Sequence, residues 1–109
     1  EYNIKYSNRT ALENLFNRRG NADDIIIVKD GLITDSSYAN LLFYNGKTWV
    51  TPAKPLLAGT QREYLLHKGI IDIDHIRPSH IINFKIVRMV NSMMSFEDKV
   101  DIKISDLVL

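Results

Sequence analysis

The sequence of 109 residues predicts one α+β domain, and three observations carry this prediction. Two pairs of apolar segments are each joined by a turn-forming dipeptide, Asp30-Gly31 in the first pair and Asn45-Gly46 in the second, which is typical of β-hairpins. Two short segments repeat apolar residues at helical spacing and end at a glycine. Residues 70–76 and 84–90 add two further strand-like segments.

The N-terminal part is expected to contain a strand, a helix and the first hairpin. Residues 2–6 alternate polar and apolar side chains, as a strand does. Apolar residues at helical spacing predict an amphipathic helix over residues 10–19, which stops at Gly20. The β-branched run at residues 24–29 is then expected to pair with residues 32–34.

The second hairpin is expected to join residues 39–44 to residues 47–51. Both residues of its turn, Asn45 and Gly46, are expected to adopt positive φ angles. The returning strand is expected to end before Pro52, because proline cannot donate a ladder hydrogen bond.

A second helix is predicted for residues 61–68. Gly59 lies just before its start, and Gly69 is expected to cap its C-terminus. Residues 97–109 mix alternating apolar residues with charges, so the sequence leaves open whether they form a strand, a tail or a remnant of cloning.

The composition argues against several functional classes. A formal net charge of +1 with scattered basic residues does not suit nucleic-acid binding. No metal site is expected, because cysteine is absent and the histidines (His67, His75 and His80) are widely spaced. The apolar stretches are far shorter than the roughly 20 residues of a membrane helix, and no signal-peptide layout begins the chain, so a cytoplasmic protein is expected.

Three segments contain residue types that can carry chemistry. Lys5 has apolar neighbours, and partial burial would favour its nucleophilic neutral amine, although a lysine can equally extend its ammonium group into solvent. The hydroxyl-rich segment around Asp35 can supply a carboxylate or simply cap a turn. Residues 59–62 can cradle a phosphate at a helix start, but every helix start offers free N–H groups.

Taken together and in order, these segments resemble the class IV aminotransferase family of fold-type IV pyridoxal-phosphate enzymes, from about Lys5 to Met94. The family includes branched-chain aminotransferases, D-amino-acid aminotransferases and aminodeoxychorismate lyases. The segments that carry the resemblance are Lys5-Tyr6-Ser7-Asn8-Arg9, Gly31 to Asn40, Thr51-Pro52 and Leu56 to Arg62.

The resemblance implies a fold as well as a cofactor. Residues 1–109 would be the C-terminal cofactor-binding domain of a D-amino-acid aminotransferase-like enzyme, with a mixed sheet that curls toward a barrel and short flanking helices. The family's N-terminal domain is absent from this chain. The piece alone is therefore expected to be inactive, and the missing domain and a second subunit of a homodimer are the expected partners.

By the same resemblance, Lys5 is the catalytic residue that holds pyridoxal 5'-phosphate as a Schiff base, and Asp35 faces the pyridine nitrogen. The remaining cofactor-binding positions, several of them at the phosphate, are Asn40, Gly59, Thr60, Gln61 and Ser92. The sequence departs from the family pattern at three positions: Asp35 replaces a longer Glu, Ser36 replaces Gly, and Gln61 replaces Thr.

The resemblance also suggests a reaction. Residues 5–9 and 91–94 are most similar to aminodeoxychorismate lyases, which eliminate pyruvate to give 4-aminobenzoate for folate synthesis. The alternative within the family is a transaminase that acts on branched-chain or D-amino acids, so the substrate would be an amino acid or an amino-chorismate. The alternative outside it is a non-catalytic binding module on the same scaffold.

Overall fold

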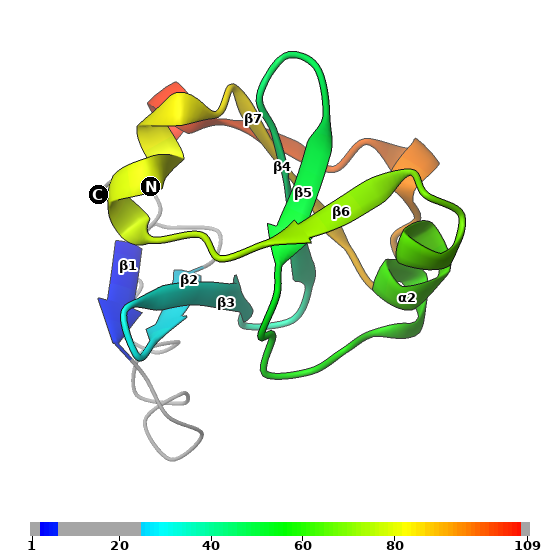
Figure 1. Ribbon diagram of the computed structural model, residues 1–109, viewed down its shortest axis with the longest axis horizontal. Coiled ribbons are helices and arrows are strands. Elements are labelled where there is room, and N and C mark those ends of the chain that lie inside the picture. The colour runs from blue at the N-terminus through cyan, green and yellow to red at the C-terminus, as the bar shows by residue number, and fades with distance from the viewer. Residues whose placement is uncertain (1–2, 7–24, 108–109) are drawn as a thin grey trace.

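The computed structural model describes residues 3–6 and 25–107, and these residues form two β-sheets with short helices (Figure 1). The smaller sheet has three strands in the order β1-β2-β3, with β1 parallel to β2 and β3 antiparallel to it. Its strands are β1 (Asn3–Tyr6), β2 (Ile25–Lys29) and β3 (Leu32–Ser36). The strands predicted at both sides of the first hairpin are therefore confirmed, as is the N-terminal strand.

The larger sheet has five strands in the order β6-β5-β4-β7-β8. It is mixed, because β5 and β6 are parallel while the other neighbours are antiparallel. Its strands are β4 (Asn40–Tyr44), β5 (Trp49–Pro52), β6 (Ile71–Asp74), β7 (Ile86–Val90) and β8 (Asp101–Lys103). The predicted strands within residues 39–51, 70–76 and 84–90 are confirmed. The expectation that the returning strand ends before Pro52 is wrong, because β5 includes Pro52, which pairs with Asp74 of the parallel strand β6.

The predicted helix at residues 61–68 is confirmed as α2 (Thr60–His67), and Gly69 follows it with a φ of 74°. That left-handed conformation is the usual helix stop, and glycine adopts it without a Cβ clash. Three 3-10 helices complete the described part: η2 (Pro78–Asn83), η3 (Phe96–Asp98) and η4 (Ile104–Asp106). The helix predicted for residues 10–19 lies outside the described residues. No helix within residues 3–6 and 25–107 has the length and hydropathy needed to cross a membrane.

The two hairpin turns differ. In the first, Asp30 and Gly31 have φ angles of 54° and 79°, as predicted for a two-residue turn between twisted strands. In the second, the prediction of a positive φ at Asn45 is wrong, and only Gly46 has one, at 102°. The Asn45 side chain explains the difference, because its Oδ1 accepts the N–H groups of Lys47 and Thr48 at 2.8 and 2.9 Å and so stabilises a longer loop.

The expectation of a sheet that curls toward a barrel is wrong for the described residues, which form two separate open sheets. Backbone N–H groups at the free edge of β3 find hydrogen-bond partners without a further strand. The N–H of Ile33 donates to the carbonyl of Ile76 at 2.7 Å, and that of Ser36 donates to the carbonyl of Ala39 at 2.9 Å. Loop carbonyls therefore take the place of a neighbouring strand at this edge, while β4 belongs to the second sheet.

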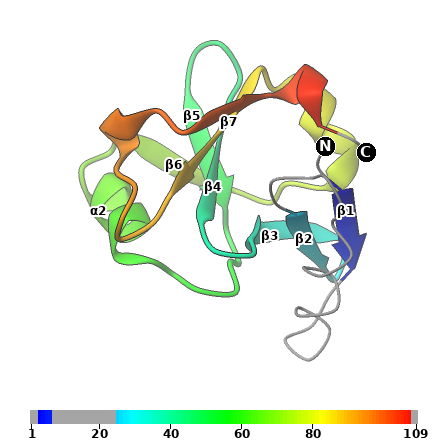
Figure 2. The same ribbon diagram turned by 180° about the vertical axis from the view of Figure 1, so that it is seen from behind.

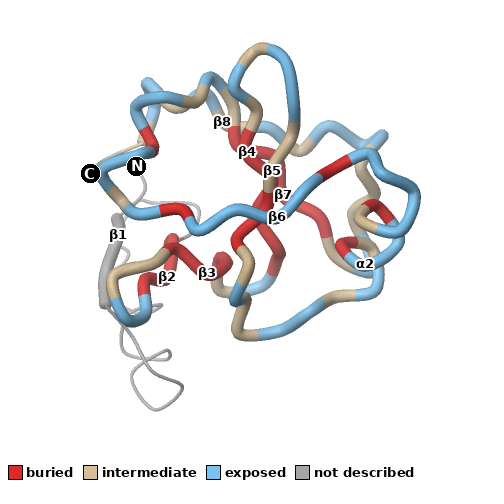
Figure 3. Tube along the Cα trace, viewed as in Figure 1, coloured by how far each residue is buried: buried red, intermediate tan, exposed pale blue. Residues whose placement is uncertain are grey.

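The main hydrophobic core lies between the two sheets (Figure 3). Side chains alternate across a strand, so Leu41 and Phe43 of β4 face this core while Leu42 faces the opposite side. There α2 covers the sheet through Leu65. Figure 2, seen from behind, shows the same arrangement, with α2 and the three-stranded sheet on different sides of the five-stranded sheet. The buried residues of the main core are Ile26, Val28, Ile33, Ala39, Leu41, Phe43, Ile76, Ile81, Val87 and Met89.

Arg88 ties the C-terminal strand to the larger sheet. Its Nε and Nη2 donate to the two carboxylate oxygens of Asp101 at 2.6 and 3.0 Å, and its Nη1 donates to the carbonyl of Phe96 at 3.0 Å. The guanidinium carbon also lies 4.6 Å from the ring centroid of Trp49 and 4.4 Å from that of Phe96. The segment after residue 96, which the sequence left open, is therefore an integral part of the fold, at least through residue 107.

We expect Arg88→Ala to lower the free energy of unfolding by about 3 kcal/mol, because it removes a buried guanidinium that packs against two rings and hydrogen-bonds Asp101 and the Phe96 carbonyl. Lys103→Ala is the matched control, since Lys103 is exposed on the same strand as Asp101, and we expect a change within about 0.5 kcal/mol. Urea titration of the full-length protein measures both. An Arg88→Ala variant as stable as the control would contradict this account.

Candidate functional site

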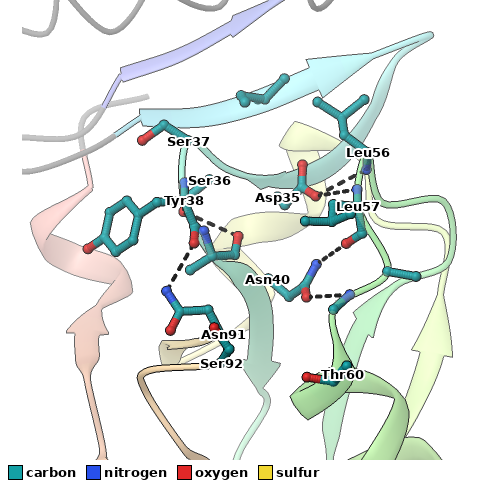
Figure 4. Close-up of a pocket in the computed structure, with 14 residues that line it drawn as sticks. Asp35, Ser36, Ser37, Tyr38, Asn40, Leu56, Leu57, Thr60, Asn91 and Ser92 are labelled. Carbon is teal, nitrogen blue, oxygen red and sulfur yellow. Dashed lines mark hydrogen bonds between the residues drawn. The ribbon is translucent and has the colours of Figure 1, made fainter.

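A cavity of about 530 Å³ lies where four segments of the chain meet (Figure 4). These segments are β2, the turn from β3 into β4, the loop that leads into α2, and the turn after β7. Five of the predicted cofactor-binding residues lie together here, because the fold brings these segments into contact: Asp35, Asn40, Gly59, Thr60 and Ser92. The lining residues are Ile27, Asp35, Ser36, Ser37, Tyr38, Ala39, Asn40, Leu56, Leu57, Ala58, Gly59, Thr60, Asn91 and Ser92.

Asp35 is a buried carboxylate in the wall of this cavity, with 4% of its surface exposed. Its Oδ2 accepts the backbone N–H groups of Leu56 and Leu57 at 3.1 and 3.2 Å. Its Oδ1 is buried and has no hydrogen-bond partner among the described residues. Burial raises the pKa of the Asp35 carboxyl above its ordinary value, and the N–H of Leu57 acts in the opposite direction. One oxygen therefore anchors a loop, and the other keeps an unused capacity to accept a hydrogen bond.

Asn40 holds the same loop a few residues further along. Its Nδ2 donates to the carbonyl of Leu57 at 2.7 Å, and its Oδ1 accepts the N–H of Gly59 at 3.1 Å. Asp35 and Asn40 together therefore fix the backbone of residues 56–59 immediately before α2 begins. The N–H of Gly59, which was expected to face a phosphate, is thus taken by Asn40.

Gly59 is required for space and not for an unusual backbone conformation, because its φ is −68°. A Cβ at this position would lie 2.5 Å from the Asn40 Oδ1 atom, a separation that real Cβ atoms essentially never show. The close approach of Asn40 and the absence of a side chain at Gly59 therefore depend on each other.

We expect Gly59→Ala to displace the Asn40 carboxamide and to loosen the loop before α2, with a loss of about 2 kcal/mol of stability. Asn40→Ala removes the same hydrogen bonds without a clash. If the two residues act as a unit, the double variant should be no less stable than Asn40→Ala alone. Thermal unfolding of the four proteins tests this, and strictly additive losses would show that Gly59 has another role.

Two further residues of the predicted phosphate site, Thr60 and Ser92, both line the cavity. Thr60 is the first residue of α2, and Ser92 lies in the turn after β7. In the view of Figure 4 both lie toward one end of the cavity and Asp35 toward the other. Gln61 is the next residue of α2 and is not among the described residues that line the cavity.

The structure describes the backbone of Lys5. Its position on β1 pairs in register with Ile27 of β2, and Ile27 lines the cavity. The other neighbour of β2 is β3. The register of these two strands shifts between the pair Ile26 and Ser36 and the pair Val28 and Ile33, so Asp35 of β3 lies opposite the region of Ile27. Strand spacing of about 4.8 Å separates the β1 and β3 backbones by roughly 10 Å here.

Several cavity residues were not predicted from the sequence. Leu56 and Leu57 contribute backbone N–H groups, and Asn91 contributes a carboxamide that donates to the carbonyl of Tyr38 at 3.0 Å. The sequence signals for Asn91 were its place directly after a predicted strand and its membership of the segment 91–94, and neither signal pointed to its contact with Tyr38. No group of His, Cys, Asp and Glu side chains suited to a metal ion occurs within the described ranges.

Comparison with known proteins connects this site to a family. The model of the family described as amino-transferase class IV matches residues 3–96. A Haemophilus influenzae protein described as uncharacterized is 47% identical over 93 residues, which cover 85% of this chain and 50% of that protein. This chain therefore spans about half the length of that relative.

Solved structures agree with this match. The crystal structure of a candidate 4-amino-4-deoxychorismate lyase from Haemophilus somnus has a TM-score of 0.79 and 32% identity, over 88% of this chain and 55% of that one. A hypothetical aminotransferase from Mycobacterium tuberculosis in its PLP-bound form has a TM-score of 0.71 and 16% identity, over 87% of this chain and 44% of that one, and so shares the fold. The chain therefore belongs to the class IV aminotransferase family and has the α+β architecture of its fold-type IV domain.

Proposed function

We propose that the protein containing this domain is a pyridoxal-phosphate enzyme that eliminates pyruvate from 4-amino-4-deoxychorismate to give 4-aminobenzoate. Membership of the family and the 32% identity to a candidate lyase support the class of reaction. The observation that carries the proposal is the buried Asp35 carboxylate in the lining of this cavity, because its Oδ1 atom lacks a hydrogen-bond partner among the described residues.

The residues present fit pyridoxal phosphate. A protonated pyridine nitrogen would supply the hydrogen bond and the positive charge that the Asp35 Oδ1 atom needs, because a buried carboxylate is costly without both. At the other end, the hydroxyl groups of Thr60 and Ser92 and the free N–H groups in the first turn of α2 suit a phosphate. Lys5 shares its register position with Ile27, which lines the cavity.

In this proposal each residue has a separate task. Lys5 would hold the cofactor through its side-chain amine and would move the proton at the substrate α-carbon. Asp35 holds a proton on the pyridine nitrogen. Asn40 orients residues 56–59, and Gly59 leaves room for the Asn40 carboxamide. When bound, pyridoxal phosphate supplies an electron-accepting ring that stabilises the charge left when a bond to the α-carbon breaks.

The test separates a lyase from a transaminase. The full-length protein, loaded with pyridoxal phosphate, is given 4-amino-4-deoxychorismate without an amino acceptor, and separately branched-chain or D-amino acids with 2-oxoglutarate. Release of pyruvate and 4-aminobenzoate in the first reaction supports the proposal. Turnover in the second reaction alone would make the protein a transaminase, which is the second candidate because fold-type IV aminotransferases share this architecture. No turnover in either would favour a binding module.

The proposal includes three features of the whole protein. An N-terminal domain completes the substrate pocket, the protein forms a homodimer, and it works in the cytoplasm. Analytical ultracentrifugation of the full-length protein tests the second of these, and a monomer would overturn it.

A further inference from the structure

We propose that Asn91 is a positioning residue that sets the distance between the Asp35 end and the Ser92 end of the cavity. This inference rests on the proposed function, since it assumes a rigid ligand that must be contacted at both ends at once. Three observations about the described residues support it.

The turn after β7 is a closed unit. The N–H of Asn91 donates to the carbonyl of Met94 at 2.9 Å, and the N–H of Met94 donates to the carbonyl of Asn91 at 3.2 Å. The Asn91 Oδ1 atom accepts the N–H groups of Met93 and Met94 at 2.7 and 2.9 Å. Ser92 is enclosed in this turn, so its position follows the position of Asn91.

The turn after Asp35 is also a closed unit. The Ser36 Oγ atom accepts the N–H of Ala39 at 3.0 Å, and the N–H of Ser36 donates to the carbonyl of Ala39 at 2.9 Å. Ser36 is buried and directly follows Asp35. The Asp35 carboxylate and the Tyr38 carbonyl are therefore parts of one compact turn.

Asn91 joins the two turns. Its Nδ2 donates to the carbonyl of Tyr38 at 3.0 Å, across 53 positions of sequence (Figure 4). The orientation of the carboxamide is fixed by its partners, because two N–H groups require the oxygen on one side and a carbonyl requires the nitrogen on the other. The β4–β7 ladder ends next to this point with the pair Asn40 and Val90, so the Asn91 hydrogen bond continues the link between the two strands into the turns beyond it. Tyr38, Asn91 and Ser92 all line the cavity, so this link acts directly on the spacing of its two walls.

The chain offers a matched control for this carboxamide. Asn45 uses its Oδ1 atom in the same way, accepting the N–H groups of Lys47 and Thr48 at 2.8 and 2.9 Å. It lies in the loop between β4 and β5 and is not among the described residues that line the cavity. Asn45→Asp therefore repeats the chemical change of Asn91→Asp at a turn outside this site.

The experiment uses the full-length protein and pyridoxal phosphate. Asn91→Asp keeps the acceptor for Met93 and Met94 but places an oxygen against the Tyr38 carbonyl. We expect its affinity for pyridoxal phosphate to fall about 10-fold, since one hydrogen bond is lost and two acceptors face each other. We expect Ser92→Ala to cost much less affinity in the Asn91→Asp protein than in the wild type, because Ser92 is already misplaced. Asn45→Asp should bind within about twofold of the wild type.

A second measurement does not depend on the cofactor. In the apoprotein, Asn91→Asp should speed amide hydrogen exchange at Ala39, in the turn on the opposite wall, whereas Asn45→Asp should not. Unchanged exchange at Ala39 would overturn the inference, and so would equal Ser92→Ala effects in both backgrounds. If the wild-type protein bound no pyridoxal phosphate, the proposed function would fail, and the exchange experiment would still decide the role of Asn91.

Discussion

Lys5→Ala in the full-length protein is expected to abolish covalent attachment of pyridoxal phosphate and to lower turnover by on the order of 10⁴-fold or more. The variant loses both the amine that binds the cofactor and the group that moves the α-proton. Addition of pyridoxal phosphate, reduction with borohydride and measurement of the intact mass would detect the adduct, because reduction makes the linkage permanent.

Lys29→Ala is the control for this experiment. Lys29 ends β2, the strand next to β1, and it is exposed. We therefore expect Lys29→Ala to retain the adduct and normal turnover. A full adduct in Lys5→Ala would show that another lysine holds the cofactor, and the assignment of the site would have to move with it.

Asp35→Asn is expected to lower kcat/KM by on the order of 10²–10³-fold, which is typical for the loss of one preorganised charge at a reacting centre. Asparagine has the size of aspartate and keeps an oxygen for the N–H groups of Leu56 and Leu57, so the loop should stay in place. Asp35→Glu restores the side chain that the family usually carries and should retain more activity than Asp35→Asn. Equal activity of Asp35→Asn and wild type would contradict the role of the carboxylate.

The dependence of binding on pH provides a second readout for Asp35. Because burial raises the pKa of this carboxyl, it becomes protonated at a higher pH than an ordinary aspartate as the solution is acidified. A protonated carboxyl no longer attracts a pyridinium ion. The ratio of wild-type to Asp35→Asn affinity for pyridoxal phosphate should therefore decrease as the pH falls through this raised pKa. A ratio that is constant with pH would mean that the charge of Asp35 does not contribute to binding.

Local patterns were sufficient to predict most of the described strands and the helix. Asp30-Gly31 specifies a two-residue turn, and Gly69 specifies a helix stop, because glycine and aspartate tolerate positive φ angles. The turn at Asn45 was predicted incorrectly because the same residue type can cap a longer loop through its side chain. The division into two sheets could not be predicted either, because it involves long-range contacts such as the one between the edge of β3 and the Ile76 carbonyl, 43 positions away from Ile33.

The site was predicted in part. The resemblance to a family identified Asp35, Asn40, Gly59, Thr60 and Ser92, all of which line one cavity. The resemblance could not predict the hydrogen bonds between the loops that position these residues. The contact of Asn40 with Gly59 and the link from Asn91 to Tyr38 are long-range contacts between loops, and no local pattern in the sequence encodes them.

The central claim is that Lys5 and Asp35 hold opposite ends of one cofactor ring, and a crystal structure of the full-length protein with pyridoxal phosphate tests it most directly. The account predicts electron density that is continuous from the Lys5 side chain to the ring, with the pyridine nitrogen about 2.7–3.2 Å from the Asp35 Oδ1 atom. A ring bound to a different lysine, or a pyridine nitrogen out of hydrogen-bonding reach of Asp35, would contradict it.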